Sequence, residues 1–124
     1  MVLMIDTTCG EEIKVSLVGQ GVNFSKKILA PRKQAEKLLP FIVKILNHQK
    51  IDWRQIEEIK VQNNGGSFTS LRIGVLTANA LAYALGVPVN PVDNQAVAVF
   101  SGIKVVKPCY QSEPNIGRAK NPTC

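Results

Sequence analysis

Two short polar turns hold the residues of this sequence that could bind a cofactor. Asp6 and Thr7 end the first apolar run, and Gly65 and Gly66 stand between a strand-like segment and a helix-like one. Glycines there allow left-handed or tight backbone, and the helix that follows can present free amides to a phosphate. The spacing of a phosphate loop and its lysine are missing. We favour a structural turn at Gly65 and Gly66, with phosphate binding as the alternative.

The other reactive side chains do not form a recognisable catalytic set. His48 is the single histidine, and Cys9, Cys109 and Cys124 are odd in number and widely spaced. These residues spell out no zinc site, no disulfide framework and no Ser/His/Asp or Cys/His arrangement. We expect reduced thiols, with a bridge between Cys109 and Cys124 as an open alternative, and no catalytic or metal-binding residue.

The apolar pattern predicts an α/β domain that begins with strands and then alternates helices with strands. The expected order is strands at 2–5, 13–17 and 22–29, helices at 31–46 and 53–56, a strand at 58–62, a helix at 67–85, a strand at 87–92 and a helix from 93 or 94 to 100. Pro40 should kink the first long helix or start it afresh. We expect one folded domain at 1–102 and a polar, proline-containing tail at 103–124, with no second lobe.

The helix expected at 67–85 supports the main functional inference. Arg72 is its only charge, so we expect neither face to stay in water. Small residues recur at every fourth position and permit close approach of a second helix, which is either the chain's own first helix or one from a partner. The predicted partner interface consists of Leu38, Ile42, Ser70, Leu71, Gly74, Val75, Ala78 and Ala82.

The net charge of +6 gathers in residues 26–60 and 104–124. We favour a solvated helix face and a soluble tail as its explanation, because few aromatic residues stand among the lysines. The alternative is contact with a nucleic-acid backbone. The candidate residues for that contact are Lys26, Lys27, Arg32, Lys33 and Lys37.

The hydropathy pattern favours a cytoplasmic protein that does not enter a membrane. No run reaches the roughly 18 uncharged apolar residues of a membrane span. The first apolar run also leads directly into Asp6 without a basic leader.

Residues 64–74 suggest a family. They read N-G-G-S-F-T-S-L-R-I-G, which resembles the TsaB/YeaZ signature G-P-G-S-F-T-G-L-R-I-G and coincides with it at eight of eleven positions. The departures are Asn64, Gly65 and Ser70. Residues 5–8 resemble the family's I-D-T-S strand end, residues 35–42 its first helix, and residues 86–89 the segment after its second helix. The sequence is identified as a member of the TsaB/YeaZ family over roughly residues 2–100.

The resemblance implies an actin-like (ASKHA, ribonuclease H-like) half-fold, in which two long helices pack on a five-stranded mixed sheet. It also implies a non-catalytic scaffold in the synthesis of threonylcarbamoyladenosine (t6A) in tRNA. Such a subunit docks through its helix pair onto TsaD, the catalytic subunit, or forms a homodimer. A TsaE-type ATPase is a further implied partner, and tRNA is reached through the complex. The complex uses ATP, which the chain alone does not bind.

The resemblance also gives Asp6 an alternative role. In the ATPase relatives an aspartate at the end of the first strand helps to hold the metal ion of a nucleotide through water. Asp6, Thr7, Gly65 and Gly66 are therefore the candidate cofactor residues. We favour a structural role for Asp6, because a nucleotide cleft needs a second lobe. The functions that stay open are a basic tRNA-contacting module and an ATP-dependent or peptidase-like enzyme.

Overall fold

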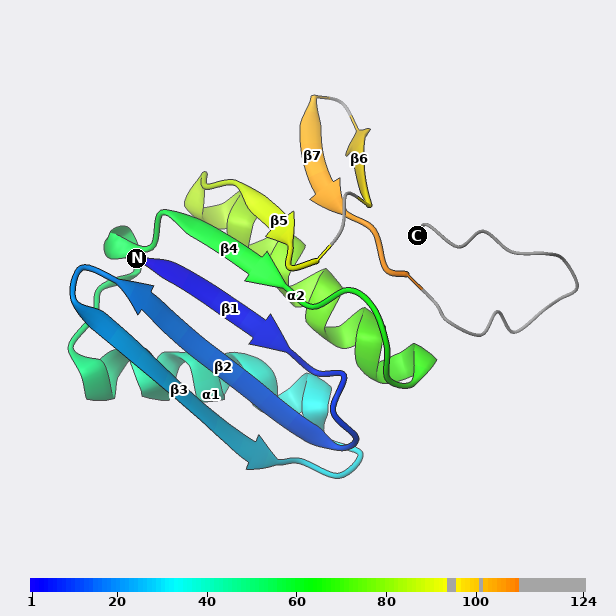
Figure 1. Ribbon diagram of the computed structural model, residues 1–124, viewed down its shortest axis with the longest axis horizontal. Coiled ribbons are helices and arrows are strands. Elements are labelled where there is room, and N and C mark those ends of the chain that lie inside the picture. The colour runs from blue at the N-terminus through cyan, green and yellow to red at the C-terminus, as the bar shows by residue number, and fades with distance from the viewer. Residues whose placement is uncertain (94–95, 101, 110–124) are drawn as a thin grey trace, which may run out of the picture.

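The computed structural model contains the sheet of the predicted half-fold (Figure 1) and describes residues 1–93, 96–100 and 102–109. The strands of this sheet are β1 (Val2–Asp6), β2 (Glu12–Gly19), β3 (Val22–Leu29), β4 (Glu58–Val61) and β5 (Val89–Pro91). Their order is β3-β2-β1-β4-β5. The pairs β1–β2 and β2–β3 are antiparallel, whereas β1–β4 and β4–β5 are parallel. The predicted antiparallel meander with parallel crossovers is confirmed.

The alternation of apolar residues decides which face of the sheet is covered. Ile13, Val15 and Leu17 of β2 are fully buried, while Lys14 between them is exposed. Both long helices, α1 (Gln34–Gln49) and α2 (Phe68–Leu85), lie on the same face of the sheet in Figure 1. The core therefore lies between this pair of helices and the apolar side of the strands.

The helix α1 is continuous through Pro40, so it does not start afresh there. Pro40 has no N–H to donate to the carbonyl group four residues earlier in the helix. Because Pro40 is exposed, water can bind that carbonyl group instead. The helix begins at Gln34 rather than at Pro31 and ends before Lys50, whose backbone is left-handed with φ of 57°. The predicted first helix is therefore confirmed with a later start.

The helix α2 begins and ends where its capping residues predict. The Ser67 hydroxyl accepts a hydrogen bond from the backbone N–H of Ser70 at 3.1 Å, and Gly86 ends the helix with φ of +69°. By length and composition alone α2 could cross a membrane, and it is the one such helix among the described residues. Its inner side, however, is buried in the core of this domain, as in the central helix of a globular protein.

The helix predicted at 93–100 is wrong. Val97–Phe100 forms strand β6, which pairs antiparallel with β7 (Ile103–Val106) in a separate two-stranded sheet. The segment is short and rich in β-branched residues, and Gly102, with φ of +80°, lies in the turn between the strands. Asn94, one of the two caps considered for the expected helix, lies outside the described residues.

Packing against the domain continues beyond residue 102, where the sequence predicts the start of a polar tail. Val106 belongs to the main core and Cys109 is buried. The backbone of Cys109 also forms a parallel bridge with Asn64, in the connection between β4 and α2. Residues 103–109 are therefore part of the packed domain, and residues 110–124 of the expected tail lie outside the described residues.

Candidate functional site

The two polar turns singled out in the sequence meet at one end of the sheet. Gly66 has φ of +74°, and a Cβ atom added to it would lie 2.8 Å from both Cα and the carbonyl oxygen of Thr8. No side chain fits such a gap, so this glycine permits backbone-to-backbone contact between the β4–α2 turn and the β1–β2 turn. The structure thus brings Asp6, Thr7, Gly65 and Gly66 to the same end of the molecule.

A buried polar network fixes these turns to both helices. The Thr7 hydroxyl donates to the carbonyl oxygen of Ser70 at 2.5 Å, and the Ser70 hydroxyl donates to Oε1 of Gln34 at 2.6 Å. Nε2 of Gln34 donates to the carbonyl oxygens of Glu12 at 2.9 Å and Thr7 at 3.3 Å. The network therefore ties the end of β1 and the start of β2 to the first turns of α1 and α2.

The same network explains a glycine inside α2. A Cβ atom on Gly74 would lie 2.6 Å from Oγ1 of Thr7. At Gly74 the small side of α2 therefore packs closely against Thr7, the residue that follows β1. Gln34 joins this network but was missed from the sequence, because a polar residue at the start of a helix gives no sign that it is buried.

Asp6 has the structural role that the sequence analysis favoured. Its Oδ1 accepts hydrogen bonds from the backbone N–H of Thr8 at 2.7 Å and from the Thr8 hydroxyl at 2.6 Å. Its Oδ2 lies 3.9 Å from Sγ of Cys9, at the outer end of the turn. These contacts shape the turn in the manner of an Asx turn, with the carboxylate binding amides of its own loop.

The side chains of these turns offer little to a nucleotide phosphate. Thr7 is fully buried, so its hydroxyl cannot reach a ligand, and Ser67 already caps the start of α2. Residues 6–10 and 62–67 contain no lysine or arginine that could neutralise a phosphate. The described residues also contain no group of three or more acidic, histidine or cysteine side chains arranged for a metal ion. We derive no step through ATP at this end of the sheet.

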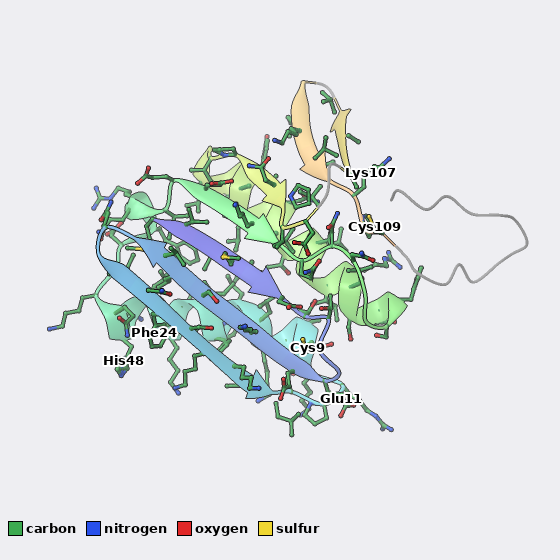
Figure 2. The ribbon with its side chains drawn as sticks, in the orientation of Figure 1. Cys9, Glu11, Phe24, His48, Lys107 and Cys109 are labelled. Carbon is green, nitrogen blue, oxygen red and sulfur yellow. The ribbon has the colours of Figure 1, made fainter. Side chains whose placement is uncertain are left out.

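The reactive side chains considered in the sequence lie apart from one another. Figure 2 shows His48 near the end of α1 that is far from the turn carrying Cys9, and Cys109 beside the β4–α2 connection. Cys9 is exposed and Cys109 is buried. This placement keeps the imidazole of His48 away from the thiols of Cys9 and Cys109.

The predicted partner interface is wrong in its residues, because all eight of them are buried within this chain. The apolar stripes at helical spacing face the sheet and the neighbouring helix, where Leu38, Ile42, Leu71 and Val75 make the core. A side chain that is already covered cannot contact a partner without unfolding. The alternative weighed for the sequence, packing between the chain's own helices, accounts for this set.

Several of the side chains that remain exposed on the helix pair are nevertheless apolar. We call them the outer helix face, which consists of Leu39 and Val43 on α1 and of Leu76 and Tyr83 on α2. These residues are 45%, 37%, 60% and 69% exposed, respectively. Leu39 and Val43 are one turn apart and line a shallow hollow with Pro40, Lys44 and Asn47. Exposed large apolar side chains such as these, on each of the two helices, favour a protein contact.

A further aromatic side chain lies at the start of α2. Phe68 is partly exposed, and the guanidinium carbon of Arg72 lies 5.4 Å from the centre of its ring. This cation–π contact places the only charge of α2 close to its first turn. The remainder of the exposed side of α2 is therefore uncharged.

The predicted basic residues do not share one surface. Lys26 and Lys27 are neighbours on β3, so their side chains leave opposite faces of the sheet. Nζ of Lys27 lies 3.8 Å from a carboxylate oxygen of Glu12. The exposed residues Arg32 and Lys33 precede α1, and Lys37 lies in its first turn. The last three form the more local basic group.

Known proteins match this chain over most of its length. A family model described as TsaD, tRNA N6-adenosine threonylcarbamoyltransferase, matches residues 19–111. The TsaB protein of Haemophilus influenzae, described as a tRNA threonylcarbamoyladenosine biosynthesis protein, is 32% identical over 92 residues, which are 74% of this chain and 39% of that protein. A tRNA N6-adenosine threonylcarbamoyltransferase of Protochlamydia amoebophila is 29% identical over 119 residues, covering 83% of this chain and 35% of the enzyme.

The fold matches solved structures as well. YeaZ from Pseudomonas aeruginosa superposes with a TM-score of 0.69 and 30% sequence identity, over 77% of this chain and 44% of that protein. The curated and structural matches agree that this chain spans about two-fifths of the length of its relatives. The similarity therefore concerns the part of those proteins that this half-fold represents.

Proposed function

We propose a function from the premise that this chain belongs to the family described as TsaD, tRNA N6-adenosine threonylcarbamoyltransferase, with TsaB and YeaZ proteins among its homologues. The chain takes part in t6A synthesis as a non-catalytic subunit. It binds and supports a TsaD-type catalytic subunit. It acts in the cytoplasm, where the tRNA that the complex modifies is found. ATP is used by the assembled complex rather than bound by this chain alone.

The outer helix face is the observation that supports this proposal. Leu76 and Tyr83 are large apolar side chains that stand exposed two turns apart on an uncharged surface of α2. Leu39 and Val43 add apolar area on α1, beside the hollow that Pro40 also lines. Aromatic and aliphatic side chains of this kind are the usual anchors of protein interfaces. A scaffold needs such a surface, whereas an independent enzyme does not.

The polar turns support a non-catalytic role by how their groups are used. The Thr7 hydroxyl, the Ser70 hydroxyl and the Gln34 amide bind one another or backbone carbonyls inside the domain. Asp6 binds the amide and hydroxyl of Thr8. These side chains hold the fold together, so this end of the sheet positions α1 and α2.

Co-purification with a TsaD-type subunit from the same source tests the proposal. We expect the unmodified chain to elute with that subunit and Leu76→Glu to elute alone, because the substitution puts a charge in the middle of an apolar contact. Leu29→Glu is the matched control, since Leu29 is 67% exposed but lies on the edge strand β3. A complex that survives Leu76→Glu, or that is lost equally in the control, would contradict the proposed interface.

A second candidate function is direct contact with tRNA through Arg32, Lys33 and Lys37. These three side chains are exposed and close in sequence at the start of α1. Lysine and arginine groups of this kind bind phosphate backbones without reading sequence. This contact is compatible with the scaffold role, because the basic group and the apolar anchors lie at different places on the helix pair. A TsaE-type ATPase and homodimer formation remain expectations from the resemblance.

A further inference from the structure

Residues 102–109, which we call the strap, are attached to the domain by asparagines that bind strap backbone. Oδ1 of Asn79 accepts a hydrogen bond from the N–H of Val106 at 2.8 Å, and its Nδ2 donates to the Val106 carbonyl at 3.0 Å. Nδ2 of Asn63 donates to the Lys107 carbonyl at 2.7 Å, and the backbone carbonyl of Asn63 accepts from the N–H of Cys109 at 2.6 Å. Two asparagines therefore fix four backbone groups of the strap.

The strap is structurally separate from the main sheet. β7 pairs only with β6 among the described strands, and in Figure 1 this hairpin projects from the edge of the sheet near β5. A two-stranded hairpin has little stability of its own in water. Val99 and Ile103 near the turn are exposed, so that end of the hairpin buries little apolar area.

The strap becomes buried at its other end. Val106 packs in the main core next to Asn79, and Cys109 is buried beside the fully buried Asn63. Figure 2 shows Lys107 and Cys109 alongside the connection from β4 to α2. The attachment thus depends on two buried side chains, on the asparagine contacts and on a hydrogen bond from Nζ of Lys104 to Oδ1 of Asn90 at 2.6 Å. Val106 is the one strap residue in the main core, whose other members lie within residues 1–89.

We propose that the strap, together with the strand β6 that pairs with it, docks on and undocks from α2 and the β4–α2 turn as a unit, while the five-stranded sheet stays folded. Asn79 and Asn63 stabilise the docked state relative to the undocked state, because they bind strap backbone groups that would otherwise bind water. Undocking carries the Cys109 thiol from the interior into solvent. It also uncovers the flank of α2 and the edge of β5, which contact β7 in the docked state.

Thiol labelling measures this opening directly. In a full-length chain with Cys9→Ser and Cys124→Ser, Cys109 is the single thiol left for iodoacetamide. We expect Asn79→Ala to raise its labelling rate about tenfold or more, since two buried backbone groups lose their partner. Asn47→Ala is the matched control, because Asn47 is exposed on α1. A labelling rate that does not change in Asn79→Ala, or that changes equally in the control, overturns the proposal.

Hydrogen exchange on the unsubstituted chain gives a second test that does not depend on a variant folding. We expect the amides of Val106 and Cys109 to exchange at least tenfold faster than those of Leu3 and Ile5 in the central strand β1, after correction for intrinsic rates. That result identifies an opening that leaves the sheet intact. Equal protection of both groups means that the strap opens only when the whole domain unfolds, and it contradicts the proposal.

Discussion

The inner and outer sides of α2 both carry large apolar residues, but they differ in how far the rest of the chain covers them. Leu71 and Val75 on the inner side of α2 are almost fully buried against the sheet, whereas Leu76 and Tyr83 on the outer side are more than half exposed. Both sides of α2 carry large apolar residues at helical spacing. The difference teaches that an apolar stripe identifies a contact but not the partner of that contact. The partner is decided by what the rest of the chain already covers.

The largest effect should come from a charge on the inner side. Ala78 is fully buried, so Ala78→Glu places a carboxylate in the core with no partner. We expect a loss of about 4 kcal/mol or more of the free energy of unfolding, enough to unfold a small domain. Circular dichroism and thermal melting of the isolated chain measure this loss.

The matched control for that substitution lies on the same helix. Ala80→Glu introduces the same group two residues later, where the side chain is exposed. It should leave the melting temperature within a few degrees of that of the unsubstituted chain. If both variants unfold, or if neither does, the division of α2 into an inner and an outer side is incorrect.

Adding a methyl group at Gly74 should show how tightly the inner side of α2 is packed. Gly74→Ala places a Cβ atom against Oγ1 of Thr7, and we expect it to lower the free energy of unfolding by about 1–3 kcal/mol. Thr7→Ala removes the atoms that the new methyl group meets. The double variant should therefore lose less stability than the sum of the single variants, as measured by urea unfolding. Additive losses would show that the two residues are not in contact.

A smaller effect, on tRNA binding, is expected from substitutions in the basic group at the start of α1. If Lys33 and Lys37 bind phosphates, the double variant Lys33→Glu and Lys37→Glu should weaken tRNA binding and reduce the slope of log affinity against log salt by about 2. Filter binding or anisotropy across a salt series measures this slope.

The control for tRNA binding keeps the same change in net charge. Lys14→Glu with Lys60→Glu alters two lysines on the face of the sheet that the helices leave open. This pair should change the slope less than the α1 pair does. Equal slopes for both pairs would indicate general attraction of a basic chain and no local contact.

The smallest effect should come from an exposed ion pair. The ammonium group of Met1 lies 2.8 Å from Oε2 of Glu57, and this hydrogen bond lowers the pKa of the Glu57 carboxyl. Because the folded-state pKa is the lower one, the pair contributes fully above the unfolded value of about 4.3 and is lost as pH falls through the folded value.

Melting temperatures of the unsubstituted chain and of Glu57→Gln should therefore differ slightly at neutral pH and converge in acid. Glu36→Gln, at another exposed glutamate, serves as the control. A difference that stays constant from about pH 7 to pH 3 would mean that Glu57 acts through something other than its charge.

The sequence predicted the elements with strong periodicity and missed what depends on tertiary contacts. Strands β1 to β5 and both long helices follow from apolar alternation, from the Ser67 cap and from the stop at Gly86. Residues 97–100 were assigned to a helix because a short apolar run fits either structure, and only the pairing with β7 decides between them. The strap contacts of Asn79 and Asn63 join residues that are distant in sequence, so no local pattern reveals them.

The candidate site was also predicted only in part, because some of its contacts depend on tertiary structure. The family signature identified the turn at residues 64–66, and the close approach of Gly66 to Thr8 gives that turn a physical cause. The interface residues were assigned to the wrong side of the helices, because Ser70, Gly74, Ala78 and Ala82 recur at the spacing that a docking helix would also show. Their burial depends on the position of the sheet, which periodicity does not contain.

The most direct test of the outer helix face is the affinity of alanine-substituted variants for a TsaD-type subunit. Titration should show that Tyr83→Ala and Leu76→Ala each weaken binding by about tenfold to a hundredfold, since exposed apolar anchors dominate such contacts. Leu29→Ala, at an equally exposed leucine on β3, should bind like the unsubstituted chain. Full affinity in the Tyr83 and Leu76 variants would contradict the assignment of the outer helix face as the docking surface.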